Sequence, residues 1–146
     1  MNWTRDPYMI STDRARIDRR LVHDFLASSY WARGIPAEVV NRSIEHSLCF
    51  GVYQGAAQVG FARVITDEAT FAYLADVFIL DGHRGRGLGK WLMEAILAYP
   101  DLQGLRRWSL VTRDAHGLYT QFGFAPLAHP ERCMELVNVE IYTQKA

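Results

Sequence analysis

The stretch Asp76-Val-Phe-Ile-Leu-Asp-Gly-His-Arg-Gly-Arg-Gly-Leu-Gly-Lys-Trp-Leu-Met-Glu-Ala-Ile-Leu-Ala-Tyr99 decides the fold. Its first part, Val77 to Leu80, is a run of apolar and β-branched residues, which predicts a buried strand. Its last part, Leu88 to Tyr99, repeats apolar residues at helical spacing, and Pro100 stops the run. Three glycines lie between the two parts, in Arg84-Gly-Arg-Gly-Leu-Gly89. The stretch therefore predicts a strand that turns through a glycine-rich segment into a helix.

The glycine-rich segment has the properties of an anion-binding turn. Glycine lets the main chain approach a ligand closely, and the first N–H groups of a helix have no partner within it. Those groups and the positive end of the helix dipole favour a phosphate or a pyrophosphate. Arg84, Arg86 and Lys90 add positive charge. The alternative is that the glycines only permit a tight turn between strand and helix.

Two common phosphate-binding signatures do not fit this segment. The dinucleotide fingerprint G-x-G-x-x-G would need a third glycine where Lys90 stands. A P-loop would need Ser or Thr after its lysine, and Trp91 follows here. The spacing that does fit is R-x-x-G-x-G, formed by Arg84, Gly87 and Gly89.

Two motifs resemble those of one protein family. Arg84-x-x-Gly87-x-Gly89, after a strand and at the start of a helix, resembles motif A of the GCN5-related N-acetyltransferases (GNAT). The stretch Thr112-Arg-Asp-Ala-His-Gly-Leu-Tyr-Thr-Gln-Phe-Gly-Phe124 resembles motif B, in the loose form N-x-x-A-x-x-L-Y-x-x-x-G-F. Tyr119 falls on the matching tyrosine, and Asp114 stands where many members carry Asn. Two motifs in their expected structural contexts are far more specific than either alone.

The resemblance covers residues 52–124, and the order of the elements expected in the rest of the chain agrees with it. It implies a single α/β domain over residues 1–146, with helices on both faces of a mixed, mostly antiparallel sheet that is splayed at the acetyl-CoA site. Acetyl-CoA would be the acetyl-donating cosubstrate, with its pyrophosphate in the glycine-rich segment. The residues that the resemblance and the charges assign to this ligand are Val77, Phe78, Ile79, Arg84, Gly85, Arg86, Gly87, Leu88, Gly89, Lys90 and Asp114.

Hydrophobic periodicity and turn residues predict the remaining elements. Helices are expected from Thr12 or Asp13 to about Tyr30, at 37–46 and at 115–122, the last with Asp114 as its N-cap. Strands are expected at 7–12, 49–53, 58–65, 71–80, 108–112, 124–127 and 134–142. The last two strands would close the sheet.

Length and composition are those of one ordinary globular domain. The 146 residues are 49% hydrophobic and 22% charged. Sixteen basic and sixteen acidic residues cancel, so no overall field indicates nucleic acid or a membrane surface as a partner. The chain has neither an apolar run long enough to span a bilayer nor an apolar signal core. Cys49 and Cys133 lack metal-ligand spacing, which favours a protein of the reducing cytoplasm without a bound metal.

Acetyl transfer to an amine requires a base, a stabilised oxyanion and an acid that protonates the departing thiolate. Tyr119 is the predicted acid, because a phenol with a pKa of about 10 can protonate a thiolate whose thiol has a pKa of about 8.5. The alternative is a tyrosine that packs between helix and sheet. The family stabilises the oxyanion with main-chain N–H groups of the strand before the glycines, here Val77 to Ile79.

Asp76 is the predicted base, since it is the acid in an otherwise apolar strand. A buried carboxylate that accepts main-chain N–H groups is the alternative, and a chain of water molecules could then act as the base. Residues 73–79 resemble the corresponding strand of diamine acetyltransferases, although Ala75 takes one acidic place here. Tyr30, Trp31 and Tyr73 are predicted to contact the acceptor, with packing as the alternative for the first two.

We therefore expect a cytoplasmic N-acetyltransferase that acts on a primary amine of a small molecule. One alternative is a protein lysine or N-terminal acetyltransferase. Another is a CoA-binding sensor or interaction module on the same fold. The tyrosine at position 119 and the unbroken glycine-rich segment favour an enzyme. The sequence is compatible with a monomer and with a homodimer.

Overall fold

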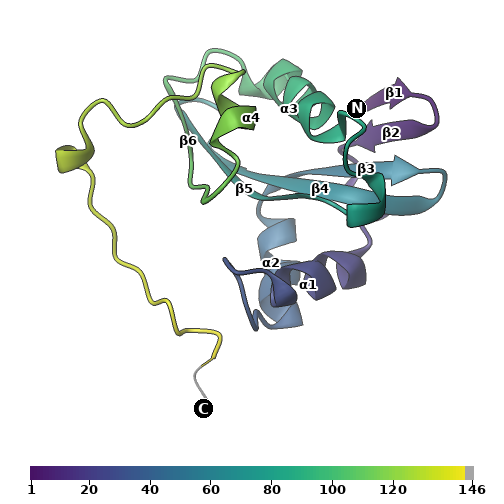
Figure 1. Cartoon of the computed structure of the whole chain (residues 1–146), viewed down its shortest axis with the longest axis horizontal. Helices are drawn as coiled ribbons and strands as arrows, with labels where there is room; N and C mark the ends of the chain where they lie inside the picture. The colour runs from purple at the N-terminus through teal and green to yellow at the C-terminus, as the bar shows by residue number, and fades with distance from the viewer. Residues whose placement is uncertain (144–146) are drawn as a thin grey trace.

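The computed structural model describes residues 1–143. Its centre is one sheet of six strands in the order β1-β2-β3-β4-β5-β6 (Figure 1). The strands are β1 (Asn2–Arg5), β2 (Tyr8–Ser11), β3 (Leu48–Gln54), β4 (Ala57–Thr66), β5 (Phe71–Ile79) and β6 (Arg107–Leu110). The helices are α1 (Arg19–Ser28), α2 (Ala37–Glu45), α3 (Leu88–Ala98) and α4 (His116–Thr120). Short 3₁₀ turns are η1 (Arg14–Arg16), η2 (Asp81–His83), η3 (Pro100–Leu102) and η4 (Pro130–Arg132).

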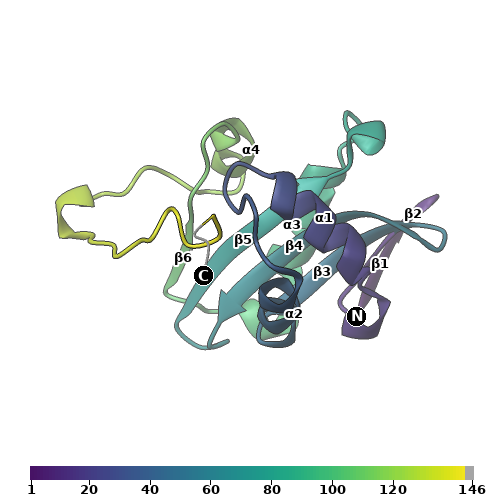
Figure 2. The same ribbon diagram turned by 90° about the horizontal axis from the view of Figure 1, so that it is seen from below.

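Helices cover both faces of the sheet, as predicted. Helices α3 and α4 lie on one face, and α1 and α2 lie on the other (Figures 1 and 2). Two apolar cores result, one on each face. Helix α3 contributes most to the first core, because six of its residues are buried: Leu88, Trp91, Leu92, Met93, Ala95 and Ile96. Each fully buried large apolar side chain contributes about 1.5–3 kcal/mol, so α3 is fixed firmly on the sheet.

The sheet opens between its last two strands. All neighbours from β1 to β5 are antiparallel, whereas β5 and β6 are parallel and pair only Phe71–Leu74 with Arg107–Leu110. Beyond Leu74, β5 continues to Ile79 with β4 as its neighbour in the described chain. At Asp76, φ is 55° and the register with β4 shifts, which marks a bulge that bends the strand. The predicted mixed sheet with a splay after β5 is therefore confirmed.

The N-terminal region differs from the prediction in two respects. β1 was not predicted, yet it forms a hairpin with β2 through the cis peptide bond Asp6–Pro7. The first helix begins at Arg19 rather than after residue 13, because Asp18 provides its N-cap and accepts the Leu21 N–H at 3.0 Å. The Asp13 side chain instead caps the short turn η1. Two caps five residues apart divide the predicted helix.

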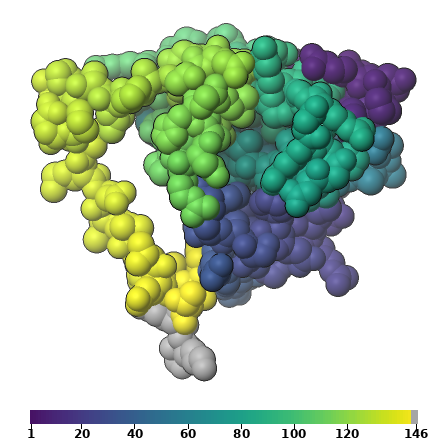
Figure 3. Space-filling model, viewed as in Figure 1, coloured from purple at the N-terminus to yellow at the C-terminus, as the bar shows by residue number. Residues whose placement is uncertain are grey.

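The C-terminal region is the main correction to the predicted fold. The strands expected at 124–127 and 134–142 do not form. Residues 125–143, here called the C-terminal arm, run away from the sheet and return to the α1–α2 side, where Tyr142 packs against the second core (Figures 1 and 3). The alternation of apolar and polar residues that predicted a strand is present. A strand also needs a hydrogen-bonded neighbour, and no described residue pairs with the arm in this way.

Three further features bear on the predicted class of protein. No helix among residues 1–143 has the length and apolarity needed to cross a bilayer. In the same range no three His, Cys, Asp or Glu side chains are placed to hold a metal ion. Both cysteines are free thiols, and burial above all raises the pKa of Cys49 to about 11, whereas Cys133 is exposed.

Candidate active site

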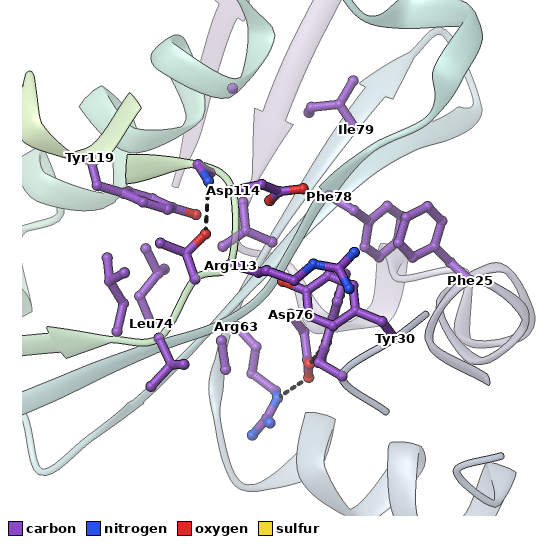
Figure 4. Close-up of a pocket in the computed structure, with 18 of the residues that line it drawn as sticks. Phe25, Tyr30, Arg63, Leu74, Asp76, Phe78, Ile79, Arg113, Asp114 and Tyr119 are labelled. Atoms are coloured by element: carbon purple, nitrogen blue, oxygen red, sulfur yellow. Dashed lines mark hydrogen bonds and ion pairs between the residues drawn. The ribbon is translucent and has the colours of Figure 1, made fainter. Parts of the chain in front are cut away.

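The parting of β5 and β6 leaves a cleft of about 990 Å³ (Figure 4). Its walls come from five parts of the chain: β5, the start of α3, the segment between β6 and α4, the α1–α2 region and the C-terminal arm. The predicted site residues that line it are Tyr30, Trp31, Tyr73, Asp76, Val77, Phe78, Ile79, Arg84, Gly85, Gly87, Leu88, Gly89, Asp114 and Tyr119. The fold thus brings residues that are distant in the sequence to one place.

The main chain of β5 offers hydrogen-bonding groups to the cleft. The Leu80 N–H donates to the Val59 carbonyl at 2.8 Å, so the main chain of Leu80 faces β4. Main-chain groups of successive strand residues point to opposite sides. Phe78 therefore also faces β4, whereas Val77 and Ile79 face the cleft. The Ile79 carbonyl accepts a hydrogen bond from Arg84 Nε at 3.0 Å, so the geometry favours Val77 and Ile79 over Phe78 as main-chain contacts.

The glycine-rich turn is open toward the cleft. Gly85 and Gly87 have φ values of 78° and 75°, a region that glycine adopts readily and other residues do not. No neighbouring atom lies within 4 Å of the place where a Cβ would stand at either glycine. Gly87 is the N-cap of α3 and provides no side-chain cap. The first N–H groups of the helix therefore remain available to an anion.

Two predicted ligand residues lie outside the cleft. Lys90 is exposed on α3, and Arg86 Nη1 donates a hydrogen bond to the Tyr8 hydroxyl at 2.9 Å. The same hydroxyl lies 2.9 Å from His83 Nδ1. Arg86 therefore ties the glycine-rich turn to β2. A contact of Arg86 or Lys90 with the ligand stays a prediction.

Tyr119 reaches the cleft from α4. It is only 8% exposed, and its ring meets Phe124 edge to face with 5.9 Å between centroids. Figure 4 shows its hydroxyl directed into the cleft. Burial raises the pKa of the phenol above its ordinary value, and the nearby Tyr30 and Asp114 raise it further. The hydroxyl therefore keeps its proton at neutral pH and well above it.

The helix that carries Tyr119 is not capped as predicted. Its N-cap is Ala115, and the Ala115 N–H donates to the Thr112 hydroxyl at 3.0 Å. The Thr112 hydroxyl thus pairs with the N–H of the N-cap residue itself, and no side chain caps the first N–H groups of the helix. Asp114 lines the cleft as an exposed side chain.

At the end of the cleft opposite the glycine-rich turn, Asp76 connects three parts of the chain. One carboxylate oxygen accepts a hydrogen bond from Trp31 Nε1 at 2.9 Å, and the other accepts one from Arg63 Nε at 2.9 Å. The side chains of Arg63 and Asp76 are only 16% and 10% exposed. The charge of Asp76 is therefore balanced by a neighbouring arginine that is itself largely shielded from solvent.

Aromatic side chains form the walls of this end. Tyr30 and Trp31 are 47% and 42% exposed and meet edge to face with 5.1 Å between centroids. The Arg113 guanidinium lies over the Tyr30 ring at 3.8 Å (Figure 4). Burial, and then the charge of Asp76, raises the pKa of Tyr73. This end can hold a ligand between aromatic faces close to a carboxylate.

Comparison with known proteins identifies the family. The model of the acetyltransferase (GNAT) domain matches residues 45–126. A protein of Gibberella zeae named "Putative acetyltransferase FG08082" is 35% identical over 142 residues, which span 81% of this chain and 78% of that protein. The chain belongs to the GNAT family. This GNAT protein is therefore an acetyl-CoA-dependent acetyltransferase.

Solved structures agree with this assignment. The crystal structure of a putative GNAT-family acetyltransferase from Xanthomonas campestris pv. campestris is 52% identical, with a TM-score of 0.92 over 94% of this chain and 97% of that one. The structure of a predicted acetyltransferase from Clostridium acetobutylicum with acetyl-CoA is 14% identical, with a TM-score of 0.64 over 94% of this chain and 96% of that one. The second likeness concerns the GNAT fold alone.

The cleft of this GNAT chain also contains residues that were not among the predicted site residues, and Phe25, Arg63, Arg113, Glu135 and Val137 are five of them. Arg63 carried a signal, because a charged residue within an apolar strand needs a partner. Arg113 adjoins Asp114 in motif B. The other three have no local signal, since only the tertiary fold brings them to the cleft.

Proposed function

We propose that the protein transfers the acetyl group of acetyl-CoA to a primary amine of a small molecule, by direct attack of the amine and with Tyr119 as the general acid. One observation carries this proposal. The open main chain of β5, the glycine-rich turn and the Tyr119 hydroxyl all border one cleft. These are the three features that bind the donor at both ends and protonate its leaving group.

The residues of the cleft suit acetyl-CoA. The uncapped N–H groups at the start of α3 suit its pyrophosphate, and the open space at Gly85 and Gly87 admits the phosphate groups close to the main chain. The outward-facing main chain of Val77 and Ile79 suits the amide groups of its pantetheine arm. Arg84 lies beside both regions, held by Asp81 at 2.8 Å and by the Ile79 carbonyl. Acetyl-CoA supplies an acetyl group activated as a thioester.

Tyr119 provides the proton that the departing thiolate needs. Its raised pKa, caused first by burial, keeps the phenol protonated before the reaction. Proton transfer to a thiolate sulfur lowers the cost of its departure, and a positioned acid of this kind contributes about 10²- to 10⁴-fold to the rate. The Tyr119 hydroxyl donates this proton inside the cleft.

The end of the cleft around Tyr30, Trp31 and Asp76, here called the acceptor end, favours an amine as the acceptor. A primary ammonium group binds well against aromatic faces, here those of Tyr30, Trp31 and Tyr73. The Asp76 carboxylate adds attraction for the ammonium, although Arg63 offsets part of its charge. Each carboxylate oxygen has a further lone pair beyond its present hydrogen bond. Asp76 can therefore accept the proton of the amine directly or through a water molecule.

An assay of thiol release with a panel of amines tests the proposal. We expect free CoA to form with at least one small primary amine, and CoA to raise the melting temperature whereas NAD and ATP do not. Release with peptides but with no small amine would favour the protein acetyltransferase. Binding of CoA without release of thiol by any acceptor would favour the sensor. No stabilisation by CoA would contradict the assignment of the cleft.

A further inference from the structure

Of the arginines that border the cleft within residues 1–143, one has no acidic partner there. Arg63 pairs with Asp76 at 2.9 Å, and Arg84 pairs with Asp81 at 2.8 Å. Arg113 lines the same cleft, and no carboxylate of the described residues lies within salt-bridge distance of its guanidinium. A guanidinium carries five N–H donors and keeps its charge in proteins. Arg113 is therefore a cation with which a ligand in the cleft can pair.

The Tyr30 ring holds this guanidinium in place. Arg113 follows β6 and Tyr30 follows α1, so their contact joins two walls of the cleft. The guanidinium lies 3.8 Å from the centroid of the ring (Figure 4). Arginine stacks on an aromatic ring through its flat face, and its N–H groups lie in the plane of the guanidinium. The contact therefore orders the charged group and leaves its donors for a planar partner.

The side of the acceptor end that is formed by β5 is acidic. The carboxylates of Asp76 and Glu135 both border the cleft. Burial raises the pKa of Tyr73 most, the charge of Asp76 raises it further, and Glu135 adds a smaller increase. Both carboxylates therefore act near the Tyr73 ring, although Arg63 offsets part of the charge of Asp76. The acceptor end thus presents carboxylates beside Tyr73 and a cation over Tyr30.

The charges around Arg113 favour a carboxylate over a phosphate as its partner. Arg113 supplies one positive charge, and Asp114 and Glu135 are acids of the cleft that form no salt bridge within residues 1–143. A phosphate monoester carries a charge of about −1.5 to −2 at pH 7, so these two acids would repel it more strongly. A carboxylate carries a single charge and accepts two parallel N–H bonds from one guanidinium.

We propose that the acceptor is a primary amine that also carries a carboxylate, and that Arg113 binds this carboxylate. The ammonium group lies beside Tyr73 and Asp76, and the carboxylate lies against the guanidinium over Tyr30. Both charges of the acceptor are then matched, and its amine faces β5. This inference rests on the proposed transfer of acetyl to an amine and adds the side chain that selects among amines. Arg113 thereby determines specificity and takes no part in the chemical step.

Thiol release with matched acceptors tests the selection by charge. The amino acids are glycine, β-alanine and γ-aminobutyrate, each compared with its own amide, and butylamine, putrescine and phosphoethanolamine complete the panel. We expect kcat/KM for the best amino acid to exceed that for its amide by at least about tenfold, since the amide lacks a charged hydrogen bond. An amide, butylamine, putrescine or phosphoethanolamine that reacts as well as the best amino acid would overturn this inference and leave acetyl transfer to an amine intact.

Substitution of Arg113 tests the residue itself. We expect Arg113→Gln to raise KM for the best amino acid at least about tenfold, with KM for acetyl-CoA and for butylamine unchanged. Arg113→Glu should make putrescine the better acceptor, because it reverses the charge. Arg106→Gln is the matched control, since Arg106 is exposed and does not line the cleft. An equal loss for the amino acid and its amide, or a loss confined to acetyl-CoA, would overturn the assignment of Arg113.

Calorimetry separates a failure of this inference from a failure of the proposed function. Each amino acid of the panel is titrated into the wild-type protein and into Arg113→Gln, both in the presence of CoA. If no amine releases thiol, the proposed function fails, but binding to the wild type that is at least about tenfold weaker in Arg113→Gln would still support the carboxylate site. No binding of any of the three amino acids, or equal binding by the two proteins, would overturn the inference.

Discussion

At its glycine-rich end the cleft presents main-chain groups, whereas at its acceptor end it presents side chains. The glycine-rich end is built from one continuous stretch, residues 77–89, whose strand, turn and helix expose N–H groups by their geometry. The acceptor end combines Trp31, Arg63, Asp76 and Arg113 with residues of the arm. A ligand that is bound through main-chain groups depends on the local backbone geometry, whereas an acceptor is selected by side chains that several elements contribute.

Replacement of Tyr119 should have the largest effect, because it removes a chemical group and leaves both ends of the cleft intact. We expect Tyr119→Phe to lower kcat by about 10²- to 10⁴-fold with little change in KM for acetyl-CoA or for the amine. Steady-state kinetics would measure this, with Tyr99→Phe as the control, a tyrosine of the first core outside the cleft. A kcat within twofold of the wild type would remove Tyr119 from the mechanism.

The pH dependence of the rate should identify the same group. The proposed mechanism needs the protonated phenol, and burial raises the pKa of Tyr119. The fall in kcat with rising pH should therefore lie above the ordinary phenol pKa of about 10, and it should disappear in Tyr119→Phe. A wild-type profile that falls between pH 7 and 9 because of this residue would contradict the direction of the shift.

Asp76→Asn should separate the two ends of the cleft. The change keeps the shape of the side chain but removes the charge that pairs with Arg63. Since a hydrogen bond to a charged group contributes about 1.5–3 kcal/mol, we expect kcat/KM for the amine to fall about tenfold or more, with KM for acetyl-CoA unchanged. Initial rates at varied amine and varied acetyl-CoA would show this. An equal loss of kcat/KM for the amine and for acetyl-CoA would mean that the two ends of the cleft do not act independently.

A second variant decides how Asp76 acts. Trp31→Phe removes the indole N–H that donates to Asp76 and leaves the carboxylate in place. If Asp76 only positions its neighbours, Asp76→Asn and Trp31→Phe should lower kcat/KM for the amine to a similar extent. If Asp76 is the base, Asp76→Asn should lower kcat far more than Trp31→Phe does, because only Asp76→Asn removes the group that takes the proton.

The sequence predicted the fold of the glycine-rich end well because its signals are local. The apolar runs of β3, β4 and β5 and the periodicity of α3 each indicate one element, and the family motifs predict a ligand at the turn between β5 and α3. The acceptor end was less predictable, since Trp31 meets Asp76 only after the chain has folded. The C-terminal arm likewise shows that a local sequence pattern does not predict tertiary neighbours. Its alternating pattern predicts a strand between 134 and 142, but a local pattern does not specify which edge that strand joins.

Gly87→Ala should weaken the binding of acetyl-CoA at the glycine-rich end and leave the binding of the amine unchanged. Gly87 has a left-handed φ of 75°, which costs other residues roughly 1–2 kcal/mol. We expect KM for acetyl-CoA to rise about five- to thirtyfold, with KM for the amine unchanged. Gly55→Ala is a matched control, because Gly55 has a φ of 61° and open space around its Cβ position but lies in the β3–β4 hairpin. Equal losses of acetyl-CoA affinity in both variants would show that the effect is one of overall stability.

Tyr8→Phe should have the smallest effect and should show that the glycine-rich end also depends on a side chain. The Tyr8 hydroxyl accepts a hydrogen bond from Arg86 and lies within hydrogen-bonding distance of His83, so it holds the turn against β2. Loss of one hydrogen bond of about 0.5–1.5 kcal/mol should raise KM for acetyl-CoA a few-fold and leave kcat and KM for the amine unchanged. Arg86→Lys should have a similar effect, and the combination of both changes should be no worse than either, because each removes the same contact. Additive losses would instead indicate that Arg86 also contacts the pyrophosphate.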